Sequence, residues 1–201
     1  MTAALFSTTY FGPVQWYQKL NRCDRVLIEA CESYQKQSYR NRCVIATTNG
    51  LQALTVPVEG SSKDCIRDIR ISDHNNWRHL HWNALLSAYS ESPFFDYYAD
   101  DVRPFFERRW QFLFDFNLEI IHTMCTLLDV RPTVSLTTAY EKSPARLADL
   151  RTVISPKHPA ADPDFEPKPY YQVFALRHGF QPNLSILDLL FNMGPEGIFC
   201  L

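Results

Sequence analysis

A polar run between two apolar stretches carries the densest set of chemically useful side chains in the sequence. It extends from Tyr34 to Arg42 and holds three cations, three amides and two phenols, with no aliphatic residue. Arginine offers a planar fork that binds oxyanions through two hydrogen bonds, and lysine adds a point charge. The run therefore predicts a site for an anionic ligand, with Lys36, Arg40 and Arg42 as its cations. The alternative is a solvated connection whose arginines pair with surface carboxylates.

A second cluster of functional side chains lies between Trp77 and Trp82. Its two histidines, His79 and His81, are two residues apart and therefore face different sides of a helix, which argues against a shared metal ion. Histidine exchanges protons near neutral pH, so His81 is a candidate general base. The alternative is a partly buried histidine among aromatic side chains. No metal ion or cofactor is predicted from the sequence.

The motifs of several reaction classes are absent. The sequence contains no P-loop, no Gly-x-Gly-x-x-Gly and no His-Glu-x-x-His, so nucleotide hydrolysis, dinucleotide redox chemistry and zinc peptidase chemistry lose their usual support. The six cysteines include no Cys-x-x-Cys pair, which favours reduced thiols in the core over a disulfide or zinc framework. The residues alone leave open whether the protein is an enzyme.

Length and composition predict one domain over residues 1–201. The chain is 46% apolar and 14% aromatic, enough to bury roughly 70% of its unfolded surface in one core. Its net charge of -2 supplies no general attraction for nucleic acid. No apolar stretch reaches the roughly 18 residues of a membrane span, and the N-terminus has no basic leader. We therefore expect a cytoplasmic protein with no membrane span.

Strand and helix signals alternate in the N-terminal half. Residues 5–9 and 26–28 read as strands on either side of a short helix over 14–20, which predicts a βαβ unit. The unbroken apolar run at 26–28 is expected to be buried on both faces. Asn49-Gly50 lies between two β-prone runs and predicts a hairpin, because both central turn positions require positive φ. Residues 66–71 are a candidate for one further strand.

Helical spacing of apolar residues dominates the middle of the chain. The predicted helices cover residues 77–88, 94–110 with a break at Pro104, and 118–130, and Ser72, Asp73 or Asn75 is expected to cap the first of them. Residues 133–138 and 170–174 are predicted to join the sheet, residues 155–169 to form a surface loop or lid, and residues 185–192 to form a helix capped by Ser185. The predicted fold class is α/β or α+β, with a mixed sheet and a hairpin packed against central helices.

The order of these motifs resembles the WbqC-like protein family over nearly the whole chain. The segments that carry the resemblance are Arg40-Asn41-Arg42, Leu54-Thr55-Val56-Pro57-Val58, Trp77 with His81, Tyr89, Pro93-Phe94-Phe95 with Tyr97, and the run from Leu184 to Asn192. Many relatives carry His-Gln-Pro after the first strand, where this chain has Thr8-Thr9-Tyr10. If that histidine is catalytic in the family, the activity is in doubt here.

The resemblance implies a bacterial cytoplasmic protein, linked in some members to O-antigen or other surface-polysaccharide biosynthesis. The candidate catalytic residues are His81, Lys36 and Tyr39. The candidate substrate-binding residues are Gln15, Tyr17, Tyr34, Arg40, Asn41, Arg42, Trp82, Asp188 and Asn192. The last two are four residues apart on one helical face, so the alternative for them is to fasten a neighbouring loop.

Two functions follow as hypotheses. In the first, the protein is a group transferase of surface-glycan or activated-sugar metabolism that takes a nucleotide-sugar or other anionic donor, with His81 as base and Tyr34 or Tyr39 facing the sugar. In the second, it is a non-catalytic ligand-binding or assembly protein. An enzyme is expected to gather Arg40, Arg42 and His81 around one pocket, whereas a binding protein is expected to show a flat apolar patch. The sequence determines neither the substrate nor the oligomeric state.

Overall fold

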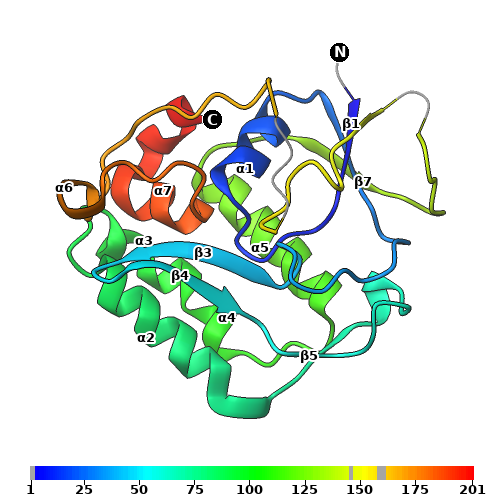
Figure 1. Ribbon diagram of the computed structural model, residues 1–201, viewed down its shortest axis with the longest axis horizontal. Coiled ribbons are helices and arrows are strands. Elements are labelled where there is room, and N and C mark those ends of the chain that lie inside the picture. The colour runs from blue at the N-terminus through cyan, green and yellow to red at the C-terminus, as the bar shows by residue number, and fades with distance from the viewer. Residues whose placement is uncertain (1–2, 145–146, 158–161) are drawn as a thin grey trace.

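Figure 1 shows the computed structural model of the chain, which describes residues 3–144, 147–157 and 162–201. Its central sheet has four parallel strands in the order β7 (Thr133–Leu136), β2 (Arg25–Ile28), β1 (Ala3–Phe6) and β8 (Ala148–Asp149). Helix α1 (Val14–Asn21) connects β1 to β2, because two neighbouring parallel strands need a crossover. The predicted βαβ unit is confirmed.

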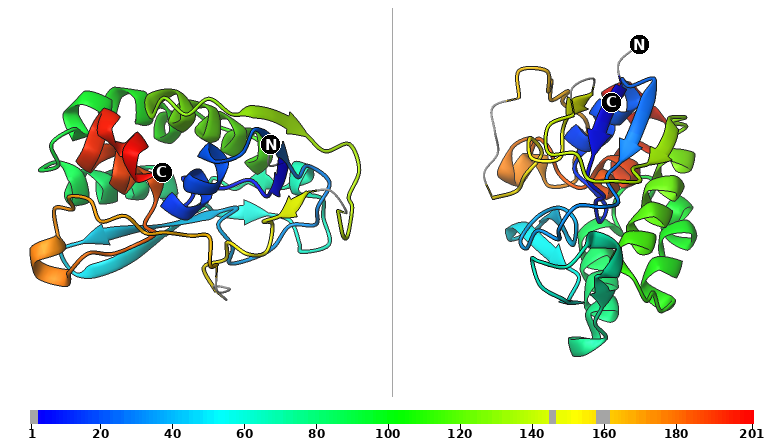
Figure 2. Two further views of the ribbon diagram at one scale, coloured as in Figure 1. Left: turned by 90° about the horizontal axis from the view of Figure 1, so that it is seen from above. Right: turned by 90° about the vertical axis from the view of Figure 1, so that its right-hand side faces the viewer.

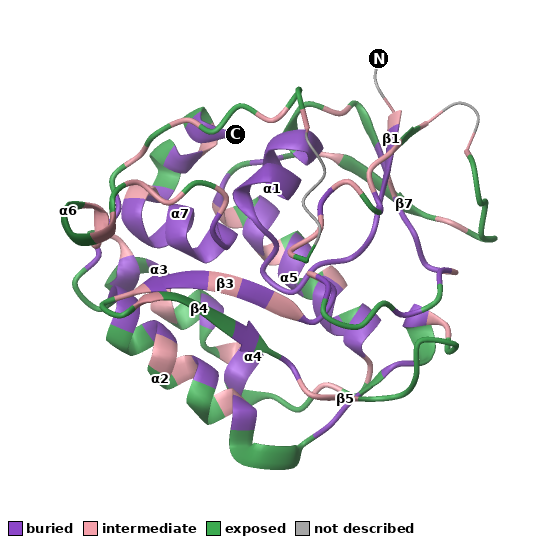
Figure 3. Cartoon of the chain, in the orientation of Figure 1, coloured by how far each residue is buried: buried purple, intermediate pink, exposed green. Residues whose placement is uncertain are grey.

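One face of β1 and β2 belongs to the core. Ala4 pairs with Val26 and Phe6 with Ile28, and all four side chains are fully buried (Figure 3). Leu27 lies on the opposite face and is only partly buried. The expectation that this strand is buried on both faces is therefore met on one face alone.

The hairpin of β3 (Arg42–Thr47) and β4 (Gly50–Thr55) is confirmed. It forms a two-stranded sheet of its own and does not join the parallel strands, so the strands do not make the single mixed sheet that was expected. The hairpin instead packs against α2 (Trp77–Tyr89) and α7 (Ile186–Met193), which Figure 2 shows from two further directions. The fold is α/β, with helices, a parallel sheet and a separate hairpin around one core.

Several element boundaries differ from the sequence-based expectations. Residues 66–71 contain the 3₁₀ turn η1 (Ile66–Asp68) and the two-residue strand β6 (Arg70–Ile71), which pairs with β5 (Val58–Glu59). The remaining elements are the 3₁₀ turn η2 (His74–Asn76), α3 (Phe95–Val102), α4 (Pro104–Glu107), α5 (Leu113–Leu127), α6 (Ala175–His178) and the 3₁₀ segment η3 (Gly194–Cys200). The predicted break at Pro104 is confirmed, and α5 begins earlier than expected.

The segment 170–174 does not join the sheet. Its Tyr170 hydroxyl and Gln172 amide donate hydrogen bonds to the Asp188 carboxylate on α7, at 2.7 and 3.0 Å. These side-chain bonds hold the segment on the helix, and the fourth strand of the sheet is β8. Part of the predicted loop, residues 158–161, lies outside the described residues. Farther along the same loop, Asp162 accepts hydrogen bonds from Gln15 and Lys19 of α1, both at 2.8 Å.

Aromatic rings join the sheet to the helices that cover it. The ring of Tyr10, just after β1, stacks on Phe116 of α5 with centroids 5.8 Å apart, and Phe11 stacks on Phe106 of α4 at 6.0 Å. Trp77 of α2 meets Phe116 edge-on at 6.2 Å. Because each such side chain buries a large apolar area, this cluster is a main source of packing energy.

Helix α7 ends at Met193, and Gly194 is its C-cap. This glycine has a φ of +54°, and a Cβ atom built on it lies 2.6 Å from the Phe94 ring. Gly179 also has a positive φ, +71°, but faces open space. Substituting each of these two glycines by alanine therefore separates two contributions to the loss of stability: strain from the positive φ, which both share, and a steric clash, which only Gly194 has.

We expect Gly194→Ala to lower the free energy of unfolding by ~2–4 kcal/mol, because the methyl group displaces the Phe94 ring in addition to straining the backbone. The matched variant Gly179→Ala should cost only ~1 kcal/mol, from backbone strain alone. Urea denaturation of the two variants and the wild type measures both values. Equal losses in the two variants would contradict the clash.

Candidate functional site

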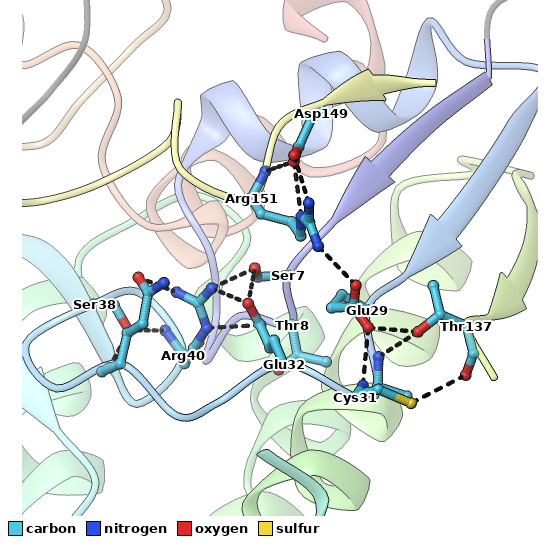
Figure 4. A network of polar contacts seen from close by, with 12 residues as sticks. Ser7, Thr8, Glu29, Cys31, Glu32, Ser38, Arg40, Thr137, Asp149 and Arg151 are labelled. Atoms are coloured by element: carbon cyan, nitrogen blue, oxygen red, sulfur yellow. Dashed lines mark hydrogen bonds and ion pairs between the residues drawn. The ribbon is translucent and has the colours of Figure 1, made fainter. Parts of the chain in front are cut away.

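The carboxyl ends of the four parallel strands bring polar residues to one edge of the sheet (Figure 4). Ser7 follows β1, Glu29 follows β2, Thr137 follows β7, and Asp149 is the last residue of β8. The chain runs outward from β1 to β2 and β7 and then crosses to the other side of β1 for β8. Open α/β sheets hold ligands at the carboxyl edge where the strand order reverses in this way.

Arg40 of the polar run reaches into this edge and meets Glu32. Its Nε donates to Glu32 Oε1 at 2.8 Å and its Nη2 to Glu32 Oε2 at 2.5 Å, while Nη2 also donates to the Ser7 hydroxyl at 2.5 Å (Figure 4). Both charged side chains are 4% exposed. The arginine therefore pairs with a buried carboxylate and not with one on the surface.

Arg151 forms the second ion-pair network, on the far side of β1. Its Nη1 donates to Glu29 Oε2 at 2.9 Å, and its Nη2 donates to Asp149 Oδ2 at 2.6 Å. The other Glu29 oxygen accepts from the Thr137 hydroxyl at 2.6 Å and from the Cys31 backbone amide at 2.9 Å. The hydrogen bonds from Arg151 hold the pKa of Asp149 below its usual value, so this carboxylate is ionised at neutral pH.

Three cavities surround the two networks. A narrow one of about 10 Å³ lies between them, with Tyr39, Arg40 and Arg151 in its wall. A second, of about 200 Å³, has a partly apolar lining with Glu29 at its polar side. A third, of about 360 Å³, is lined by residues that follow β2 together with Tyr140. The arginines themselves line only the narrow cavity, and the carboxylates that they bind, Glu29 and Glu32, line the two larger ones.

The polar run divides between the sheet edge and the hairpin. Tyr34 is buried, and burial raises its pKa to about 12. Tyr39 is partly buried, and its pKa is also raised by burial. The amide of Asn41 donates to the Val56 carbonyl at 2.9 Å, and Arg42 Nε donates to the Thr55 hydroxyl at 3.2 Å.

Three further residues of the predicted site, Lys36 of the polar run and Gln15 and Tyr17 of α1, are in different surroundings. Lys36 is exposed. Tyr17 is fully buried in α1, where its ring packs edge-on against Trp16 at 4.9 Å. Gln15, at the start of α1, joins the loop through Asp162 and accepts a hydrogen bond from the Asn183 side-chain amide at 3.0 Å. The structure therefore places Tyr34, Tyr39 and Arg40 at the sheet edge, and the other members of the predicted set elsewhere.

His81 lies in the aromatic core. Its Nδ1 is 2.8 Å from the Tyr10 hydroxyl, and its ring meets Trp77 edge-on at 5.1 Å. Burial lowers its pKa to about 4, opposed by a hydrogen bond with the Thr55 backbone, so the ring is neutral at pH 7. Trp82 lies on the same helix and packs on Phe106. Among the described residues, no side-chain hydrogen bond joins His81 to Arg40 or Arg42, and its role as a base stays a prediction.

Asp188 and Asn192 form a separate buried cluster on α7. Asp188 Oδ1 accepts from the Tyr89 hydroxyl at 3.0 Å, and Oδ2 accepts from Tyr170 and Gln172. The Asn192 amide donates to the Asp188 backbone carbonyl at 2.8 Å. Burial raises the pKa of Asp188 to about 6, opposed by the hydrogen bonds from Tyr170, Tyr89 and Gln172. These contacts fasten the segment 170–174 to the helix.

Several residues of the sheet edge were not singled out by the sequence reading. They are Ser7, Glu29, Glu32, Thr137, Asp149 and Arg151. The position of Glu29, directly after the predicted strand 26–28, is a signal that could have found it, because ligand groups gather at the carboxyl ends of parallel strands. Arg151 had no such signal, since β8 contains only two residues.

The fold and this edge define an α/β protein with a candidate ligand site at the carboxyl ends of its strands. The sequence profile of the WbqC-like protein family matches residues 8–158, and the chain belongs to that family. It is 28% identical over 218 aligned positions to a protein of Mycobacterium tuberculosis named "Uncharacterized protein Rv1507c", covering 96% of this chain and 94% of that protein. No solved structure matches the chain. Within the described residues, no helix has the length and apolar character needed to cross a membrane.

The Asp188 carboxyl group predicts a pH-dependent stability. Its folded pKa of about 6 exceeds the ordinary value of 3.8, so the folded protein binds this proton more tightly than the unfolded chain. The resulting stabilisation is fully present below about pH 4 and is lost as the pH rises through about 6. It amounts to ~3 kcal/mol.

Asp188→Asn is neutral at every pH and removes this dependence. We expect the free energy of unfolding of the wild type, relative to Asp188→Asn, to fall by ~3 kcal/mol between about pH 4 and about pH 7.5. Urea denaturation of both proteins across that range measures the difference. The contributions of the other titrating groups are the same in both proteins and cancel. A difference that does not change with pH would show that Asp188 titrates normally.

The Arg40–Glu32 pair predicts a strong coupling in stability. Arg40→Met leaves a buried carboxylate without its cation and should cost ~3–5 kcal/mol. The double variant Arg40→Met, Glu32→Gln should be more stable than the sum of the single losses implies, by ~2 kcal/mol or more. Arg131→Met is the control, because Arg131 and its partner Asp129 are 85% and 73% exposed and such pairs contribute less than ~1 kcal/mol. Additive losses would contradict direct coupling.

Proposed function

We propose that this protein is a cytoplasmic group transferase of activated-sugar or surface-polysaccharide metabolism, and that it binds an anionic donor such as a nucleotide-sugar at the carboxyl edge of the sheet. One observation carries the proposal. Two buried arginines, Arg40 and Arg151, flank the point where the strand order reverses, and both line the narrow cavity of about 10 Å³. The two larger cavities are lined by hydrogen-bond partners of these arginines, Glu29 in one and Glu32 with Gln35 in the other. Guanidinium groups held in position away from bulk water are strong binding groups for phosphate and carboxylate.

The hydrogen bonds of Arg40 indicate where the anion would bind. Its contacts with Glu32 and Ser7 are 2.8 Å or shorter, whereas Nη1 donates to the Gln35 side chain at 3.3 Å. Gln35 is exposed and lines the cavity of about 360 Å³. An anionic oxygen in this cavity can replace the Gln35 oxygen and gain a charge-assisted hydrogen bond, while Glu32 keeps the guanidinium in place.

The same cavity suits the sugar part of a donor. Tyr140 lines it and is 54% exposed, so its ring can cover the apolar face of a sugar while its hydroxyl remains available. Ser33 and Gln35 add groups that both donate and accept hydrogen bonds. This combination supports a ligand that carries hydroxyl groups beside its negative charge.

The chemistry of the transfer rests on the predicted residues His81, Lys36 and Tyr39. At pH 7 the His81 ring is neutral, which is the form that a general base needs. Its Nδ1 faces the hydroxyl of the fully buried Tyr10, and neither residue is among those that line the three cavities at the sheet edge. The enclosed position of His81 also favours a second candidate function, a non-catalytic ligand-binding or assembly protein that uses the same sheet edge.

Thermal unfolding with a panel of nucleotide-sugars tests the proposal. A ligand present at about 100 times its dissociation constant stabilises the folded state by ~2.7 kcal/mol, which is ~5–11 °C in the melting temperature for a chain of this size. We expect at least one nucleotide-sugar to produce such a shift in the wild type. Arg40→Lys keeps the charge but loses the planar fork, and it should remove most of the shift.

Arg131→Lys is the matched control, because it makes the same substitution at an exposed arginine outside the sheet edge. It should retain the full shift. Equal shifts in wild type and Arg40→Lys would place the ligand elsewhere, and no shift with any donor would overturn the proposed substrate class. A ligand that binds without turnover in the presence of acceptor sugars would favour the non-catalytic function.

A further inference from the structure

A separate groove lies between the start of α2 and α4, which are neighbours in Figure 1. Its volume is about 400 Å³, and its lining residues come from the segments 73–82 and 103–109. None of them lines the three cavities at the sheet edge. The groove is therefore separate from the candidate ligand site at the sheet edge, and an inference about it does not rest on the proposed function.

The groove carries an excess of positive charge. Three arginines line it, Arg78, Arg103 and Arg109, against two carboxylates, Asp73 and Glu107. The whole chain, in contrast, has a net charge of -2. A local cationic surface on an acidic protein favours an anionic ligand at this place.

Two of these arginines converge on a single carboxylate. Arg78 Nη1 donates to Asp73 Oδ1 at 2.6 Å, and Arg109 Nη1 lies 3.5 Å from Asp73 Oδ2. The two guanidinium groups thus already share one carboxylate, that of Asp73. Asp73 is 49% exposed in its side chain, so a solvent-borne anion has access to the same arginines.

Arg78 has hydrogen-bonding capacity left over. Its Nε and Nη2 are buried and have no hydrogen-bond partner among the described residues. Its guanidinium lies 4.7 Å from the centre of the Trp77 ring, which fixes its plane. A buried charged donor without a partner is unfavourable, so a shift of the Arg78 side chain that brings Nε or Nη2 to a ligand oxygen would satisfy donors that the fold leaves unpaired.

The beginning of α2 adds to the attraction for an anion. Sequence reasoning expected a cap from Ser72, Asp73 or Asn75, but the N-cap is Asn76, with a φ of +45° and no side-chain hydrogen bond to the first turn. Asn76 lines the groove. The positive end of this 13-residue helix, which no side chain caps, therefore begins at the groove.

The inner wall of the groove is aromatic. The partly buried Trp82 packs on Phe106 with ring centroids 5.8 Å apart, and both residues line the groove. Indole rings offer a flat surface on which another ring can stack. The site thus combines groups that bind a phosphate with a surface that binds a planar ring.

We propose that the α2–α4 groove binds a phosphorylated small molecule with a planar ring, of the nucleotide class, through Arg78, Arg103, Arg109 and Trp82. The arginines and the first turn of α2 hold the phosphate, and Trp82 stacks on the ring. This site is separate from the donor site at the sheet edge, so either can exist without the other.

Isothermal titration calorimetry of the full chain with adenosine monophosphate, inorganic phosphate and adenosine tests this inference. We expect adenosine monophosphate to bind at least tenfold more tightly than phosphate or adenosine, since only it engages both the arginines and Trp82. Its affinity should fall with rising salt, because surface charges are screened. Equal affinity for the nucleotide and inorganic phosphate, or no binding of the nucleotide at millimolar concentration, would overturn the proposal.

Two variants locate the binding. The double substitution Arg103→Ala, Arg109→Ala removes side chains that are 55% and 85% exposed, so the protein should fold and its affinity for adenosine monophosphate should fall at least tenfold. Trp82→Leu tests the stacking surface and should lower the affinity for adenosine monophosphate but not the affinity for inorganic phosphate.

Two further variants separate this site from the sheet edge. Arg131→Ala removes another exposed arginine and should bind adenosine monophosphate like the wild type, whereas Arg40→Lys reports any binding of the nucleotide at the sheet edge. If the affinity for adenosine monophosphate falls in Arg40→Lys but not in the Arg103→Ala, Arg109→Ala variant, the nucleotide binds at the sheet edge, and the proposal that it binds in the α2–α4 groove is overturned. A failure of the nucleotide-sugar experiment leaves this result unaffected.

Discussion

The fold depends on the pairing of charges buried at the carboxyl edge of the parallel sheet. Glu29 is fully buried and Glu32 nearly so, and an ionised carboxylate in such a place is tolerated only with a cation and further hydrogen bonds around it. Arg151 and Arg40 meet this requirement. Each pair also joins a long connecting segment to the end of β2, and the need to satisfy buried charge thereby fixes the path of the chain.

Strand β8 shows how much this pairing decides. Two residues in register with Ala4 and Leu5 provide few backbone hydrogen bonds, and so short a strand is marginal by itself. Directly after it, Arg151 binds Asp149, Glu29 and the Glu141 carbonyl. These side-chain bonds hold the returning chain beside β1, which places the reversal of strand order at the candidate site. The ion pairs of Arg151 therefore both hold β8 in the sheet and form part of the candidate ligand site.

A third buried carboxylate, Asp188, organises the region around α7. Asp188 collects three donors from α2 and from the segment 170–174, all of them neutral, and no cation is among these partners. Its pKa therefore rises with burial, whereas Arg151 lowers that of Asp149. The two sites show how surroundings set the pKa of a carboxyl group: burial among neutral donors raises that of Asp188, and an ion pair with Arg151 lowers that of the partly exposed Asp149.

The sequence by itself determined the elements whose signals are local. Asn49-Gly50 specifies a tight turn, Pro104 interrupts a helix, and Ser185 caps α7 by accepting a hydrogen bond from the Leu187 amide. Each of these depends on backbone preferences within a few residues. The family resemblance was likewise carried by local motifs, and the profile match confirms it.

Only the tertiary structure decided which polar residues meet. Arg151 and Glu29 are 122 positions apart, and Tyr89 and Asp188 are 99 apart, so no local pattern connects them. His81 and Arg40 were both candidate functional residues in the sequence, yet packing placed one in the aromatic core and the other at the sheet edge. The physical reason is that pairing of buried charges and packing of rings are satisfied over the whole molecule, and their partners are chosen by the three-dimensional path of the chain.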